Sequence, residues 1–153
     1  MAIVYSVQRT NTRAIPIVKN KPNEMSGRVR VAHGVYEASS LASGDVIEMF
    51  TLPDGARLLE GSLAHDAMGG STTLSVGYAA HNNAAGTAVS ASAAAYKAAA
   101  ASTSAQKVDI LATLALGSGT EIDADADGVI VTTTMGGAAG TGTIEVTIKY
   151  VLD

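Results

Sequence analysis

Three histidines, His33, His65 and His81, are the side chains best suited to acid–base chemistry or metal binding in this sequence. No two of them have the i, i+4 spacing of a helical metal site. The chain has no cysteine, which excludes thiolate nucleophiles, disulfides and cysteine-based zinc sites. No Gly-x-Ser-x-Gly motif occurs among its many serines. We therefore expect a protein that is not an enzyme and that binds no cofactor, metal or small-molecule substrate.

The segment Asp123-Ala124-Asp125-Ala126-Asp127-Gly128 is the one local pattern that suggests a ligand. Alternating acids followed by glycine match the opening of an EF-hand calcium loop, which ends in a glutamate at its twelfth position. Thr134 occupies that position here, so a complete EF-hand is excluded. A looser calcium site stays open as an alternative. We favour a polar turn in which Asp127-Gly128 leads into the next strand.

The charges divide the chain into a basic beginning and an acidic remainder. The formal net charge is −4 at pH 7, yet residues 1–30 hold six of the ten basic side chains and a single acid, Glu24. Such a chain can orient itself on a charged partner, although plain solvation of the surface is the alternative. The pI of about 5.2 and the lack of aromatic residues among the cations argue against nucleic acid. We expect the basic segment to dock on an acidic protein surface.

The first 26 residues are predicted to form an extended N-terminal arm. Residues 8–25 have neither helical nor strand periodicity, and Pro16 and Pro22 each favour extended geometry in the preceding residue. The candidate partner-binding side chains of the arm are four cations and two isoleucines: Arg9, Arg13, Ile15, Ile17, Lys19 and Lys21. Residues 27–153 are predicted to form one domain.

Strand signals recur along this domain at the short spacing typical of a β-sandwich. The turn Leu52-Pro53-Asp54-Gly55 predicts a hairpin between strands over residues 45–52 and 56–65. A second pair of strands is predicted over residues 128–135 and 143–151, joined by a glycine-rich hairpin loop at 136–142. Alternation predicts which side chains face the core in two of the strands: Leu74, Val76 and Tyr78, then Ile144, Val146, Ile148 and Tyr150. In the first strand, the same alternation places Val29, Val31 and Val35 on one face.

Two segments have an ambiguous pattern. Residues 91–101 contain eight alanines, and this helix propensity favours a short helix over a long loop. An isolated helix of this length is marginal, so we expect it to pack on the sandwich or on a neighbouring molecule. Residues 107–116 fit either a strand or a helix, and we favour the strand.

These patterns predict an all-β protein, mainly an antiparallel β-sandwich that is jelly-roll-like, with an extended N-terminal arm and one short Ala-rich helix. The N-terminus lacks the pattern of a secretory signal. No stretch approaches the roughly 18 apolar residues that a membrane span needs. We therefore expect no association with a membrane.

Three parts of the sequence together resemble small virion proteins of marine and related tailed bacteriophages: residues 44–58 with the run Leu52-Pro53-Asp54-Gly55-Ala56-Arg57, the strand Leu74-Ser75-Val76-Gly77, and the closing strand 143–151. The likeness covers residues 27–151, and none of its motifs is catalytic. The resemblance implies a capsid decoration, cement or head-fibre protein that forms trimers on the shell and has the major capsid protein as its partner.

We accordingly expect a virion structural protein that is made in the host cytoplasm and placed on the capsid surface as a homotrimer. The alternative is a receptor- or carbohydrate-binding β module of a tail or head fibre. That function needs exposed aromatic side chains to stack on sugars, and the chain has only five Tyr, one Phe and no Trp.

Overall fold

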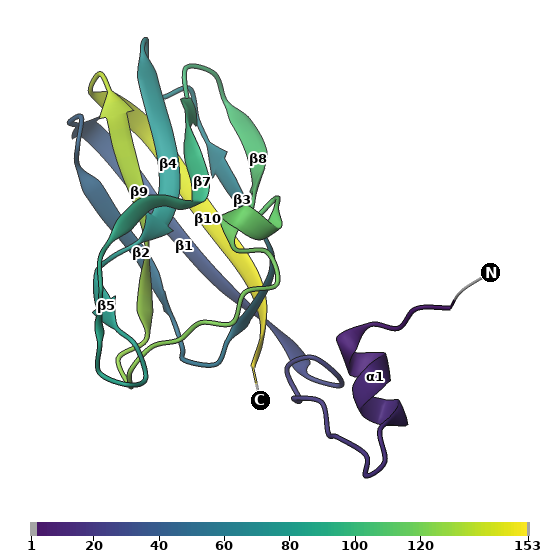
Figure 1. The fold of residues 1–153 in the computed structure, drawn as a ribbon. Coiled ribbons are helices and arrows are strands. Elements are labelled where there is room, and N and C mark those ends of the chain that lie inside the picture. The colour runs from purple at the N-terminus through teal and green to yellow at the C-terminus, as the bar shows by residue number, and fades with distance from the viewer. Residues whose placement is uncertain (1–2, 153) are drawn as a thin grey trace.

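Two four-stranded antiparallel sheets face each other and form the body of the molecule (Figure 1). The structure is a computed structural model, and it describes residues 3–152. The first sheet has the strand order β1 (Arg28–Leu41), β10 (Gly140–Leu152), β3 (Arg57–His65) and β8 (Gln106–Ile110). The second sheet has the order β2 (Val46–Leu52), β9 (Val129–Gly137), β4 (Thr72–Tyr78) and β7 (Ser92–Ala101). The expected all-β antiparallel sandwich is confirmed.

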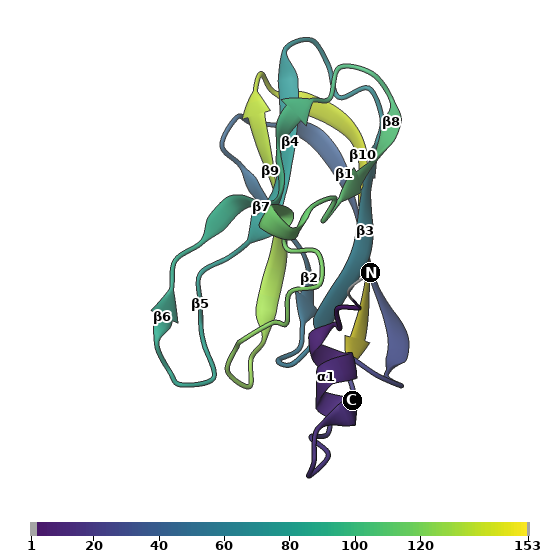
Figure 2. The same ribbon diagram turned by 45° about the vertical axis from the view of Figure 1, so that its right-hand side comes forward.

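Consecutive strands alternate between the two sheets at every connection except one. The exception joins β4 to its neighbour β7 through a small hairpin of β5 (His81–Asn82) and β6 (Ala88–Val89), which projects from one side of the body in Figure 2. Because the chain crosses repeatedly between two four-stranded sheets, its topology favours a jelly-roll-like fold.

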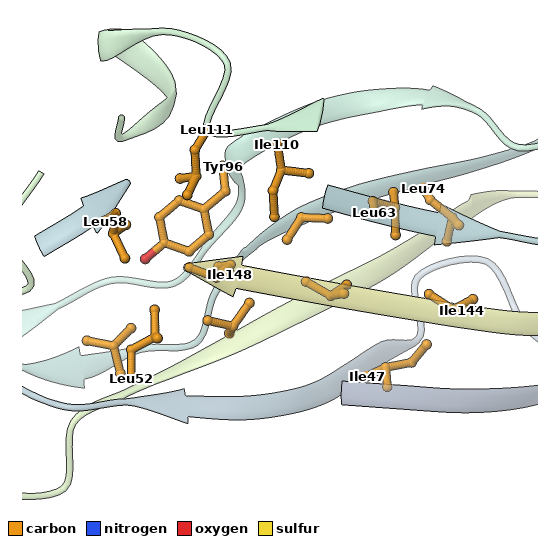
Figure 3. Close-up of a cluster of buried hydrophobic side chains, with 14 of the residues drawn as sticks. Ile47, Leu52, Leu58, Leu63, Leu74, Tyr96, Ile110, Leu111, Ile144 and Ile148 are labelled. Atoms are coloured by element: carbon orange, nitrogen blue, oxygen red, sulfur yellow. The ribbon is translucent and has the colours of Figure 1, made fainter. Parts of the chain in front are cut away.

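The core lies between the sheets and consists mainly of aliphatic side chains. Figure 3 shows leucines and isoleucines of both sheets interdigitating, with the ring of Tyr96 at one end of the cluster. The core-facing residues predicted in β4 and β10 are confirmed as buried: Leu74, Val76, Ile144, Val146 and Ile148. Tyr78 and Tyr150 are partly buried and pack against this cluster. Each fully buried aliphatic side chain contributes about 1.5–3 kcal/mol, so a core with few aromatic residues still holds the sheets together.

Both predicted hairpins are wrong. β2 and β3 lie in different sheets, and so do β9 and β10. The turn at Leu52–Gly55 carries the chain across the sandwich, where Gly55 N donates to Ile122 O at 2.9 Å. The sequence predicts the reversal correctly, but a reversal signal is the same whether the next strand pairs in one sheet or crosses to the other. Most of the predicted loop at 136–142 is strand, since β9 ends at Gly137 and β10 begins at Gly140.

The Ala-rich segment forms a strand, so the predicted helix at residues 91–101 is wrong. β7 spans Ser92–Ala101 and pairs with β4, with Val76 opposite Lys97 and Leu74 opposite Ala100. Gly77 of β4 lies against the backbone of Ser92, where any Cβ would overlap the Ser92 carbonyl oxygen. Pairing with β4 and burial of the Tyr96 ring therefore override the intrinsic helix propensity of alanine.

The remaining elements are short. The favoured strand in the segment 107–116 is confirmed for its first part as β8, but its second part is wrong, because the 3₁₀ helix η1 (Leu114–Leu116) stands there. The one α-helix of the described residues is α1 (Val7–Arg13), within the segment expected to be extended throughout. Ser6 caps this helix by accepting a hydrogen bond from Arg9 N, which favours helix initiation in a segment without clear periodicity. Neither helix in the described part of the chain is long and apolar enough to cross a membrane.

Candidate partner-binding arm

The arm base (residues 21–27) is fixed to the body by ion pairs around Arg57, the first residue of β3. Arg57 Nη2 lies 3.0 Å from Glu121 Oε2 and 3.4 Å from Glu24 Oε1. Lys21 Nζ lies 3.0 Å from Glu121 Oε1. One network therefore joins two residues of the arm base to two residues of the body.

Uncharged contacts hold the arm base in the same place. Asn23 Nδ2 donates to Gly55 O at 3.1 Å, in the turn between β2 and β3. Gly27 lies so close to Val151 that a Cβ at this position would overlap the valine side chain. Because these contacts fall just before β1, they set the direction in which the arm leaves the sandwich.

The charge network also changes the acidity of Glu121. The hydrogen bond from Lys21 lowers the pKa of this carboxyl group, and Asn23 and the positive charges of Lys21 and Arg57 lower it further, against a partial opposing effect of burial. The Lys21 side chain is largely solvent-exposed, so its ion pair alone contributes less than about 1 kcal/mol. Arg57 is only 23% exposed and contacts both acids, which makes it the central residue of the anchor.

The arm tip (residues 3–20) is braced by its own polar side chains. Asn20 Nδ2 donates to Gln8 O at 3.2 Å, and Asn20 Oδ1 accepts from Asn11 Nδ2 at 2.9 Å. These bonds tie the segment after α1 back to the helix. No residue of α1 is buried, so the tip adds nothing to the core, and it lies beyond the end of the sheets in Figure 1.

Three of the predicted partner-binding cations, Arg9, Arg13 and Lys19, lie on the arm tip and are exposed. The guanidinium carbon of Arg13 lies 4.8 Å from the centroid of the Tyr5 ring, a cation–π contact. Within residues 3–152, none of the three cations forms an ion pair. Their charge is therefore available to an acidic partner.

The two predicted isoleucines are also on the arm tip, whereas Lys21 has a different role. Ile15 is 99% exposed and Ile17 is 71% exposed. Such exposure of neighbouring large apolar side chains is typical of an interaction surface. Lys21 is held by Glu121, so the structure places it in the anchor and not with the other five predicted residues.

Sequence reasoning does not identify Arg57, Glu24 or Glu121 as residues that hold the arm. Glu24 carries one usable signal, because it is the single acid among the first 30 residues. Arg57 and Glu121 carry none, since the first begins an ordinary strand and the second lies in an irregular segment 100 residues away from its partner Lys21.

The acidic segment at 123–128 is organised as a turn. Asp123 Oδ1 accepts from Ala84 N at 3.0 Å, and Asp125 Oδ1 accepts from Asp127 N at 3.0 Å. By accepting hydrogen bonds from backbone amides, these carboxylates hold the loop in its turn conformation. In the described part of the chain, no three His, Cys, Asp or Glu side chains are arranged to hold a metal ion.

The three histidines lie apart, each with its own neighbour. Their Nδ1 atoms hydrogen bond with Thr147 Oγ1 at 2.9 Å for His33, with Asp66 O at 2.7 Å for His65 and with Ala79 O at 3.2 Å for His81. A hollow of about 340 Å³ on the outer face of the first sheet contains Glu60 and Lys149, whose charged groups pair at 2.6 Å. The hydrogen bond from Lys149 lowers the pKa of Glu60, so this carboxylate is stabilised as a surface ion and is unsuited to act as a general base near neutral pH.

Comparison with known proteins gives matches in structure alone. No protein-family model and no curated protein matches the chain. A chain in the capsid of Ralstonia phage GP4 has a TM-score of 0.59 and 27% sequence identity, covering 83% of this chain and 86% of that one. A chain in the capsid asymmetric unit of cyanophage Pam1 has a TM-score of 0.60 and 22% identity, with the same coverage. The body folds like phage capsid-associated chains.

These matches support the expected class, a phage capsid-associated protein with a structural role in the virion. They point to a function carried by surfaces instead of a reaction centre. The candidate functional site is accordingly the arm, whose base is fixed and whose tip presents apolar and cationic side chains.

Proposed function

We propose that this chain is a non-catalytic virion structural protein that decorates or cements the capsid shell of a phage, with the major capsid protein as its main partner. The observation that carries the proposal is the structural likeness to chains of two phage capsids over more than four fifths of this chain. On this proposal the protein is made in the host cytoplasm and is placed on the outer surface of the shell.

The arm tip is the proposed contact to another polypeptide of the particle. Arg9, Arg13 and Lys19 supply charge, and Ile15 and Ile17 supply apolar surface that the body does not cover. A single exposed ion pair contributes less than about 1 kcal/mol, so several copies must act together. A homotrimer provides this avidity without further contacts per chain.

Rebinding to purified shells that lack the protein tests the proposal. Deletion of residues 1–20 removes the tip but keeps the arm base with its ion pairs. We expect the shortened chain to stay folded by circular dichroism and to occupy less than about a tenth of the sites that the full chain fills, because each contact is weak alone. Normal occupancy by the shortened chain would remove the arm from the mechanism, and no binding by the full chain would overturn the decoration function.

Two variants, one with three cations of the tip removed and one with two cations of the body removed, separate the effect of charge from the effect of a shorter chain. The triple change of Arg9, Arg13 and Lys19 to alanine removes the free cations of the tip, whereas Lys97→Ala and Lys107→Ala remove cations from the body. We expect only the triple variant to lower shell occupancy at low salt. Equal effects of both sets would indicate a general dependence on net charge.

A further inference from the structure

Large apolar side chains are exposed on two parts of this molecule. Of the fifteen such residues in the described chain, eight lie between residues 3 and 25 and five lie on β1 and β2. Leu59 and Leu114 are the two elsewhere. Exposed apolar surface concentrated in this way marks places where another polypeptide binds.

The patch on β1 is a stripe along the outer face of the first sheet. Val29, Val31 and Val35 are 60%, 59% and 57% exposed. They lie an even number of residues apart and so point to the same side of the strand, with the exposed His33 between Val31 and Val35 on that face. We call these three residues the valine stripe.

Two carboxylates border the far end of the valine stripe. Glu145 of β10 lies directly opposite Val35, and Glu37 is two residues further along the same face of β1. Glu37 Oε2 accepts from Thr143 Oγ1 at 2.8 Å, which fixes it beside the stripe. Because neither acid is paired with a lysine or arginine in the described chain, this end of the stripe is negative.

The basic side chains near Glu145 include His33, Lys149 and Lys107, and Lys107 of β8 lines the same surface hollow as Glu145 without an ion pair to it among the described residues. His33 Nδ1 lies 3.8 Å from Glu145 Oε1, and Lys149 of β10 lies opposite Val31, where it pairs with Glu60 of β3. At neutral pH the Lys149 charge is therefore compensated locally. The carboxylates of Glu37 and Glu145 remain to attract a positive partner.

The arm tip carries apolar and positively charged side chains, which complement the valine stripe and its two acids. It carries Ile15 and Ile17 next to the unpaired cations Arg9, Arg13 and Lys19. In its own molecule the tip does not form an ion pair or hydrogen bond with residues 28–152, as far as the chain is described. The surface that fits the tip in both polarity and sign of charge is the valine stripe with its two acids.

We propose that the arm tip of one molecule docks on the valine stripe of a second copy. This deepens the proposed function by naming the partner of the arm. Each copy then offers one tip and one stripe, a head-to-tail contact that closes into a ring when the rotation between copies permits. The isoleucines of the tip and the three valines of the stripe then cover each other, and the cations of the tip lie near Glu37 and Glu145.

Disulfide trapping between two molecules tests the contact directly, because the chain has no cysteine of its own. One sample carries Ile17→Cys with an affinity tag and the other carries Val31→Cys without it. After mixing and mild oxidation we expect a mixed disulfide of the two chains, at a yield at least five times that obtained with Leu114→Cys in place of Val31→Cys. Leu114 is a matched control because it is 84% exposed and lies outside both patches. An equal yield with both partners would overturn the proposal.

Charge reversal gives an independent test. Glu37→Lys with Glu145→Lys should weaken self-association at low salt by about tenfold, the change that corresponds to 1.4 kcal/mol, measured by sedimentation. Changing Arg9, Arg13 and Lys19 to glutamate should weaken it similarly. Mixing the two variants should restore association, because the glutamate tip of one variant meets the lysine-bearing stripe of the other, and the unmodified tip of the second meets the unmodified stripe of the first. Circular dichroism checks that both variants fold. Failure to regain association in the mixture would contradict the pairing of these charges.

These experiments distinguish failure of the contact between tip and stripe from failure of the decoration function. Trapping and sedimentation use the free protein without shells, so self-association through the tip can succeed even if shells are not bound. Conversely, a chain that stays monomeric at high concentration yet binds shells through its arm would keep the decoration function and overturn the second copy as partner.

Discussion

Arg57 is the residue on which the arm's attachment depends most. It contacts Glu24 and Glu121 and also donates to Gly119 O at 2.7 Å. We predict that Arg57→Met, which keeps much of the side-chain length, lowers the free energy of unfolding by about 1–3 kcal/mol, because a partly buried network loses its central charge. Urea unfolding measures this. Lys149→Met is the matched control, and loss of its exposed pair with Glu60 should leave the urea midpoint nearly unchanged.

Acid should loosen the arm base through Glu121. Its pKa lies below the ordinary value of 4.5 because of Lys21, so the stabilisation is fully present above that value and is lost as the pH falls through the lower folded value. We expect hydrogen exchange at residues 21–27 to accelerate relative to the sheets as the pH falls below 4.5. Glu121→Gln should show fast exchange at pH 7 as well. Exchange in the unmodified chain that is independent of pH, after correction for the intrinsic rate, would contradict this role.

Single residues of the arm were partly predictable from the sequence. The cations and isoleucines of the tip stand out by composition alone, and the structure leaves them exposed. The anchoring role of Lys21 was not predictable, since its partner Glu121 is 100 residues away and is brought near by the fold of the β8–β9 connection. Local sequence gives the charge of a residue but not the residue that neutralises it.

At the scale of elements, the contact between β4 and β7 depends on one glycine. Gly77 is buried against the backbone of Ser92, so a methyl group there would force the two strands apart. We predict that Gly77→Ala lowers the free energy of unfolding by about 1–3 kcal/mol, as overpacking does. Gly70→Ala is the control, because nothing lies within 4 Å of a Cβ built there. Equal urea midpoints for the two variants would mean that β7 adjusts without cost.

The elements differ in how well the sequence specifies them. The alternation from Thr143 to Tyr150 is strict, and the buried face of β10 follows it. The segment 92–101 is a strand because it pairs with β4, and a propensity argument contains no information about a partner more than a dozen residues away. Likewise, the turn at Leu52–Gly55 specifies a reversal, while the sheet that receives β3 is decided by its pairing with β10 and β8.

At the scale of the whole molecule, the arm tip and the body should be thermodynamically separable. No residue of α1 is buried, and the hydrogen bonds of the tip stay within it. We predict that deletion of residues 1–20 changes the free energy of unfolding by less than about 0.5 kcal/mol, as for surface changes away from packed features. Deletion of residues 1–27 also removes Lys21, Glu24 and Gly27 and should cost about 1–3 kcal/mol more, because Arg57 and Glu121 lose partners. Equal losses in both shortened chains would place part of the stability in the tip.

The assembled particle adds a dependence on salt that a single chain does not have. Exposed charges are screened within about 10 Å at 0.1 M salt and about 3 Å at 1 M. If the cations of the tip bind acidic groups of the particle, the occupancy of shells by the full chain should fall steeply over this range. All copies of an oligomer lose their ionic contacts at the same salt concentration, so the avidity is lost as well. The variant with Arg9, Arg13 and Lys19 changed to alanine should have a lower shell occupancy at low salt and a weaker dependence of occupancy on salt. The amount of bound protein per particle is measured on gels. A salt dependence as steep in this variant as in the unmodified chain would assign the ionic contacts to the acidic body, which then has to meet a basic surface of the shell.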